Sequence, residues 1–138
     1  MKIKRTVADD FFSKCVRAAY DYTCVKCGKK YTEISRGLHC SHIYSRSHHN
    51  IRYDKLNALP MCMACHKWYG SDPIDSAHWV ESFLGWGLVD ILKEKKQVKC
   101  KIGKDEQKII AKHYKTQLKL IKERRKNTTG FIDFESYQ

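Results

Sequence analysis

Two cysteine pairs of the form Cys-x-x-Cys constrain this chain of 138 residues more than any other feature. Cys24 and Cys27 form the first pair, Cys62 and Cys65 form the second, and 34 residues separate the pairs. Four thiolates in paired turns are the ligand set that zinc takes in structural sites. We therefore expect a structural Zn²⁺ site that ties together the two ends of the 24–65 segment. In small zinc modules such a site contributes about 10 kcal/mol or more of folding free energy.

Other uses of the cysteines remain open at this stage. A mixed ligand set is one alternative, although it would leave the second pair without a metal; its members would be Cys24, Cys27, Cys40 and His42. A redox pair or buried free thiols are others. Cys15 lies among the apolar residues of a predicted helix, so we expect it in the core.

Whether the cysteines bind metal or form disulfides depends on the redox state of the compartment. The N-terminal sequence MKIKRTVADD has no apolar stretch typical of a secretion signal. No run of residues approaches the roughly 18 apolar positions that a membrane span needs. We therefore expect a cytoplasmic protein with no membrane partner. Thiols stay reduced in that compartment, which favours metal ligation over disulfides.

The charge balance points to a polyanionic partner. Lys and Arg number 27 against 15 Asp and Glu, which gives a net charge of +12. An excess of this size attracts nucleic acid first and anionic membranes second. The plain alternative is a soluble basic protein without a particular partner.

Hydrophobic periodicity predicts an α+β domain. The expected helices and strands are a helix at 7–20, strands at 38–44 and 58–61, and helices at 63–70, 75–84, 87–95 and 104–126. We divide the chain into a core with its N-terminal helix (1–95), a basic helix packed on or beside it (96–126) and a tail (127–138). The tail begins with Asn, Thr, Thr and Gly, and we expect it to fray.

Three polar residues lie between or beside the cysteine pairs: His42, Asn57 and His66. With the pairs, they form the segments CVKC, CSHI, NALPMC and MACHK, which resemble the motif of the HNH nucleases. The resemblance implies a ββα-metal finger with a four-cysteine zinc site and flanking helices. It also implies that His42 is the general base and that His66 binds a catalytic divalent metal. Asn57 would brace the loop between the strands.

These roles suit phosphodiester hydrolysis, which needs an activated nucleophile and charge neutralisation at phosphorus. A histidine near its ordinary pKa of about 6.5 is largely neutral at pH 7 and accepts a proton.

One position departs from the HNH motif. Many HNH proteins carry an Asp before the base histidine, where it supplies a second metal ligand; here the residue is Ser41, and a hydroxyl is a poor ligand for Mg²⁺. Water and phosphate oxygens are one replacement, another side chain is a second, and an inactive site is the third reading. The candidate side chains are His39, Asp54, His48 and His49. Two imidazole ligands would favour a softer ion such as Mn²⁺, Ni²⁺ or Zn²⁺. For the catalytic site we expect Mg²⁺ or Mn²⁺.

Basic residues in two places are candidate DNA contacts. Arg46, Arg52 and His49 lie in the loop between the strands, where arginine suits phosphate binding. At about 100° per residue, the lysines of the last helix fall within an arc of roughly 80°; the four central ones are Lys108, Lys112, Lys115 and Lys119. For both sets the alternative is a solvated basic surface.

Residues 8–95 also show a closer resemblance. The segments ADDFFSKCVR, CVKCGK, LHCSHIYSR, IRYDKLNALPMCMACHKWYG and FLGWGLVDIL are similar to the NinG/Rap group of lambdoid-phage recombination proteins. This implies a phage-encoded DNA endonuclease in a bacterial host, acting on branched or junction DNA. A junction-cutting enzyme needs two active sites and hence a homodimer. The rival reading is a non-catalytic zinc-finger DNA-binding protein on the same scaffold, and an RNA-directed nuclease is a third.

Overall fold

The order of helices and strands agrees with the expected α+β organisation. The computed structural model describes residues 3–137. In chain order the elements are α1 (Val7–Ala19), β1 (Leu38–His42), α2 (His49–Arg52), the 3-10 helix η1 (Lys55–Asn57), β2 (Ala58–Cys62), α3 (Met63–Ser71), α4 (Pro73–Leu84), α5 (Trp86–Gln97) and α6 (Lys104–Arg125). Every helix and strand predicted from the sequence is present, with ends shifted by a few residues at most.

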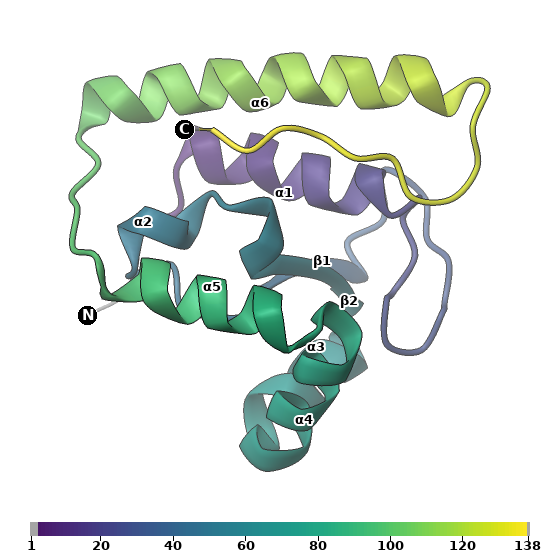
Figure 1. Cartoon of the computed structure of the whole chain (residues 1–138). Coiled ribbons are helices and arrows are strands. Elements are labelled where there is room, and N and C mark those ends of the chain that lie inside the picture. Colours follow the sequence, from purple (N-terminus) through teal and green to yellow (C-terminus); the bar gives the residue numbers. More distant parts are fainter. Residues whose placement is uncertain (1–2, 138) are drawn as a thin grey trace.

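Helix α1 is the central element of the layered arrangement. It begins with a capping box, in which the Thr6 side chain accepts the Asp9 N–H and the Asp9 carboxylate accepts the Thr6 N–H. One side of α1 packs on α6, and other residues of α1 contact β1 and β2. Figure 1 shows α6 on the far side of α1 from the hairpin. The fold thus places α6, α1 and the hairpin in successive layers.

The main core lies between α1 and α6. Phe12 of α1 meets Tyr114 of α6 edge to face, with the ring centroids 5.0 Å apart. Burying one large apolar side chain contributes about 1.5–3 kcal/mol. Cys15 is fully buried in this core, as the sequence predicts, and its thiol donates to the Tyr114 carbonyl oxygen.

The two strands form an antiparallel hairpin with a long connection. Leu38 pairs with Cys62 and His42 pairs with Ala58. The intervening loop carries α2 and η1, and α3 begins directly after β2. The hairpin therefore ends at the first residue of the second cysteine pair, which brings a strand, a helix and a metal ligand to one point.

The C-terminal segment is ordered against the core, contrary to the expectation that it frays. Ile132 and Phe134 are buried, and the Ile132 N–H donates to the Ala19 carbonyl oxygen at 2.8 Å. Figure 1 shows this segment running back along α1 and α6. Gly130 adopts a positive φ of 79° near the reversal. The expectation weighed only the polar residues at 127–130 and overlooked the two apolar residues that follow.

Helices α4 and α5 continue from α3 on the side of the hairpin away from α6 (Figure 1). Asp72 caps α4, and Pro73 occupies its first turn, as turn chemistry predicts. Among residues 3–137, none of the helices combines the length and apolar character that a membrane crossing requires.

Candidate metal centres

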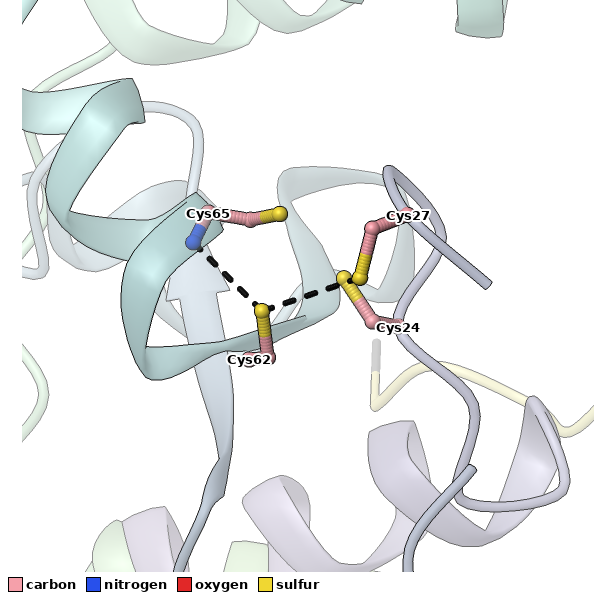
Figure 2. A group of neighbouring side chains, drawn as sticks. All are labelled: Cys24, Cys27, Cys62 and Cys65. Carbon is pink, nitrogen blue, oxygen red and sulfur yellow. Dashed lines mark hydrogen bonds between the residues drawn. The ribbon is translucent and has the colours of Figure 1, made fainter. Parts of the chain in front are cut away.

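The four cysteines of the two pairs converge on one point. The sulfur atoms of Cys24, Cys27, Cys62 and Cys65 all lie within 4.8 Å of one another. Figure 2 shows their side chains turned toward a common centre, with Cys27 Sγ 3.8 Å from Cys62 Sγ. Four sulfurs bound tetrahedrally at 2.3 Å lie about 3.8 Å apart. The cluster therefore has the donors and the spacing of a structural zinc site, as the sequence predicts.

Two backbone turns hold these sulfurs. In the first, Thr23 and Lys30 form a β-bridge, and Gly28, with φ of 80°, donates its N–H to the Cys24 carbonyl oxygen. A positive φ of this kind favours glycine. In the second, Cys62 caps α3, and its sulfur accepts the Cys65 N–H at 3.5 Å. Both turns are local, so the short Cys-x-x-Cys spacing is enough to form each half of the site.

The surroundings favour the thiolate at Cys24 but not at Cys65, where burial and the neighbouring sulfurs of Cys62 and Cys24 raise the pKa of the thiol. Burial alone would raise the pKa of the Cys24 thiol, but backbone hydrogen bonds outweigh burial and lower its pKa to about 7. Cys24 and Cys62 are buried, whereas Cys27 is exposed. Four thiolates this close repel one another, and Zn²⁺ when bound would supply the compensating charge.

The alternative mixed ligand set is wrong, because its members do not meet. Cys40 packs against the main core beside α1 rather than beside Cys24. The His42 ring also lies on the α1 side, 5.9 Å from the ring of Phe12.

A second group of metal-capable side chains lies next to the cysteine cluster. His39 Nδ1 of β1 is 3.0 Å from His66 Nδ1 of α3, and both rings are partly buried. Two nitrogens bound to one ion at 2.1 Å lie about 3.0 Å apart at a right angle. The distance is that of a hydrogen bond between the two rings, and it is also compatible with two neighbouring ligands of a single cation. Of the four substitutes considered for Ser41, His39 is the one that contacts His66.

The other candidate substitutes have different partners. Asp54 caps η1 and forms an ion pair with Lys95 at 3.0 Å. His49 Nδ1 accepts the Ile102 N–H at 3.0 Å. His48 is the N-cap residue of α2. Ser41 is buried and, because side chains alternate along a strand, lies on the same face of β1 as His39.

His42 is separated from the histidine pair. It follows Ser41 in β1, so its side chain lies on the opposite face of the strand. Its ring packs on Phe12 of α1. Its Nε2 is 3.1 Å from the Arg52 carbonyl oxygen, which can only accept, so Nε2 carries the proton. Burial, together with the charge of Arg46, lowers the pKa of His42 to about 4 despite the hydrogen bond to Arg52, which raises it. The ring is thus neutral at pH 7, with a free lone pair on Nδ1. In residues 3–137 the structure places no hydrogen bond between His42 and His39 or His66.

Asn57 is fully buried and holds the loop that follows β1. Its Oδ1 accepts the Tyr44 N–H at 2.9 Å, and its Nδ2 donates to the carbonyl oxygens of Tyr44 and Ile51. These bonds span both ends of the loop. This is the bracing geometry that the resemblance implies, while any catalytic consequence stays a prediction.

The prediction that Arg52 binds DNA phosphate is wrong. Its guanidinium is buried in a two-point contact with Asp9, at 3.0 Å and 2.6 Å, and it also donates to the Lys4 carbonyl oxygen. Arg46 is only partly engaged: its Nη1 lies 3.5 Å from Asp9 and is buried with no hydrogen-bond partner among the described residues. The role of Asp9 was not predicted. The sequence indicates a helix that includes Asp9, but not that its carboxylate pairs with Arg52, 43 residues further along the chain.

The Nδ1 atom of His49 is not available to bind phosphate, because it already accepts the Ile102 N–H. Its ring lines a cavity of about 640 Å³ between the α2 loop, the linker before α6 and the C-terminal segment. The lysines predicted to bind DNA, from Lys108 to Lys119, are exposed on α6.

The fold and the site define an α+β protein in which a two-stranded hairpin followed by a helix is closed by a four-cysteine cluster. No family model matches the chain, and comparisons with curated proteins and with solved structures gave no match either.

Proposed function

We propose that this protein is a metal-dependent DNA endonuclease of the HNH type that hydrolyses phosphodiester bonds. The observation that supports the proposal best is the 3.0 Å approach of His39 and His66, between the first strand and the helix that the cysteine cluster anchors. A protein that only binds DNA through a zinc module has no need for a second group of metal ligands beside the first.

The chemistry of the donors suggests which ion this pair takes. Two imidazoles without a carboxylate suit Mn²⁺ and later transition metals better than Mg²⁺, which prefers oxygen ligands. His39 and His66 would hold the ion and leave its other positions to water and phosphate. When bound, the cation would supply Lewis-acid stabilisation of the charge on the phosphate.

His42 is the proposed general base. The hydrogen bond to the Arg52 carbonyl oxygen fixes the tautomer that leaves Nδ1 free to accept a proton from water. A positioned base of this kind typically contributes a factor of about 10²–10⁴ in rate. For this role, Nδ1 must reach the same phosphodiester as the histidine pair.

The residues around His42 position it and supply positive charge. The Asp9 carboxylate of α1 accepts from the Arg52 side chain. The backbone carbonyl oxygen of Arg52 in turn accepts from His42 Nε2. Arg46 keeps a buried N–H without a partner beside this pair. The Arg46 side chain is more exposed than that of Arg52, so we assign the phosphate contact of this loop to Arg46.

One observation favours the rival function, a non-catalytic DNA-binding protein. His42 lies on the α1 side of β1, with its ring tilted against that of Phe12, where a well-packed core histidine would also lie. On that reading the histidine pair and His42 have no common substrate.

A nicking assay separates the two functions. Zinc-loaded protein is incubated with supercoiled plasmid in the presence and absence of Mn²⁺ or Mg²⁺. We expect nicking that needs the added metal, is faster with Mn²⁺, and falls by about 10²–10⁴ in His42→Ala.

The matched control is His78→Ala, on the exposed face of α4, which should nick at the wild-type rate. No nicking by the wild type while DNA is still bound would favour the rival. Undiminished nicking in His42→Ala would mean that the activity belongs to a contaminant or to a mechanism without His42, and would remove His42 as the general base. Parallel reactions with four-way junctions, linear duplex and RNA test the substrate class, and equal rates on junction and duplex would remove the preference for branched DNA.

A further inference from the structure

One flank of α6 carries five lysines that have no acidic partner. We call Lys104, Lys108, Lys112, Lys115 and Lys119 the lysine flank; all five are exposed. In the part of the chain that the structure describes, none of them forms an ion pair. By contrast, the next two lysines of the same arc are neutralised, Lys122 by Glu33 and Lys126 by Glu123.

The charges of the lysine flank are held in a fixed row. Successive members are three or four residues apart, so neighbouring ammonium groups repel each other on the helix surface. The row extends about 22 Å at a rise of 1.5 Å per residue. The buried stripe of α6 (Ile110, Tyr114, Leu118 and Ile121) fixes this helix to the protein, which keeps the row from reorienting. A polyanion of matching length would relieve the repulsion between these unpaired ammonium groups.

The lysine flank lies apart from the candidate metal centres. Helix α6 packs on α1, and α1 separates it from the hairpin. Figure 1 shows α6 and α3 on opposite sides of the molecule. A ligand of the lysine flank would therefore leave the histidine pair accessible.

We propose that the lysine flank is a second DNA-binding surface, which binds the phosphate backbone of duplex DNA without regard to sequence. The proposal rests on the proposed function only for the choice of DNA as polyanion. A length of 22 Å corresponds to roughly two-thirds of a turn of duplex, whose pitch is about 34 Å. A membrane is a poorer partner, because a membrane-bound helix needs a free apolar face and the apolar stripe of α6 is buried on α1.

The salt dependence of binding measures the number of lysines that contact phosphate. Each phosphate neutralised on duplex DNA contributes about −0.9 to the slope of log K against log salt concentration. Replacing four members of the flank should therefore make the slope shallower by about 3.6.

The test uses full-length, zinc-loaded protein and a fluorescent 20-base-pair duplex without added Mn²⁺ or Mg²⁺. Anisotropy titrations at several salt concentrations compare the wild type with the variant K108A/K112A/K115A/K119A. A control variant, K14A/K93A/K99A/K101A, removes the same charge from exposed lysines elsewhere that form no ion pair within residues 3–137. We expect the slope to change by about 3.6 only in the flank variant, and the four corresponding Lys→Arg substitutions to keep the wild-type slope.

Equal slopes in the two alanine variants would overturn the proposal, since the loss would then reflect net charge alone. Tighter binding of the wild type to anionic phospholipid vesicles than to DNA would overturn it as well. The nuclease proposal is tested separately. A protein that binds duplex DNA through the lysine flank but never nicks plasmid would support the binding surface and contradict the nuclease function.

Discussion

The four-cysteine cluster and the histidine pair are neighbours but differ in how complete they are. The cluster brings four sulfur donors within 4.8 Å of one another, which fills a tetrahedral coordination shell. The pair offers two nitrogens 3.0 Å apart, and within residues 3–137 no group of three or more metal-capable side chains includes it. A closed ligand set is typical of a structural site, and an open one leaves room for water or substrate. The cluster thus has the completeness of a structural zinc site, while the pair has the openness that the proposed function requires.

The two centres are also mechanically linked. Cys65 and His66 are adjacent in α3, and Cys62 caps that helix. The direction of the His66 side chain is therefore set by the turn that the cluster holds. Three substitutions test this division of roles, from the largest expected loss of folding free energy to the smallest.

Cys24→Ser should unfold the protein. Removing one thiolate opens the closed set, and structural zinc in small modules contributes about 10 kcal/mol or more, which is comparable with the whole stability of a typical domain. Elemental analysis should show zinc falling from one ion per chain, and circular dichroism should show loss of fixed tertiary structure. Cys100→Ser, at an exposed thiol outside the cluster, is the control and should keep both. A folded Cys24→Ser protein with an unchanged melting temperature would contradict the structural role of the cluster.

Asp9→Asn should cost about 3–5 kcal/mol, because it leaves the buried guanidinium of Arg52 without its counter-charge. Urea unfolding at pH 6 measures the loss. Asp10→Asn is the neighbouring control, since Asp10 pairs with Arg5 at the surface, and surface pairs contribute about 1 kcal/mol or less. Because Arg52 also holds His42, nicking should fall more in Asp9→Asn than in Asp10→Asn.

The same pair makes stability depend on pH in a defined direction. Burial would raise the pKa of the Asp9 carboxyl, but hydrogen bonds from Arg52 and Thr6 outweigh it and hold the pKa below the ordinary 3.8. The contribution of Asp9 is therefore complete above that ordinary value and is lost as the pH falls through the lower, folded value. Between pH 6 and pH 3 the wild type should lose more stability than Asp9→Asn, and equal losses would show that Asp9 is not the group involved.

His66→Ala should have the smallest effect on folding, about 1 kcal/mol or less, because the residue is only partly buried and lies outside the closed set. Zinc should remain at one ion per chain, while a separate Mn²⁺ site, followed by electron paramagnetic resonance, should disappear along with nicking. His39→Ala should weaken the same Mn²⁺ site, and the exposed control His78→Ala should leave it intact. Loss of zinc in His66→Ala would erase the distinction between the two centres.

Local patterns in the sequence predicted a large part of this protein. The Cys-x-x-Cys turns, the two strands, the five longer helices and the buried Cys15 depend on residues close together in the chain, where spacing and periodicity decide the structure. The short helices α2 and η1, in the loop between the strands, were not predicted. His39 was among the candidates for the second ligand because it lies two residues before Ser41, on the same face of the predicted strand. The errors concern contacts between distant residues: Arg52 pairs with Asp9, His49 accepts from Ile102, and the apolar end of the tail packs on the core.

The sequence by itself predicted that the four thiols would meet. Each Cys-x-x-Cys turn forms locally and supplies two ligands, and a tetrahedral zinc site needs four. Only the tertiary structure decided which charged and titratable side chains stay free for a ligand. A guanidinium or imidazole has the same chemistry in a loop whether it faces water or a buried carboxylate, and that choice is made by elements far away in the chain. Arg52 is paired with Asp9 of α1, whereas the five lysines of the lysine flank form no ion pair within residues 3–137.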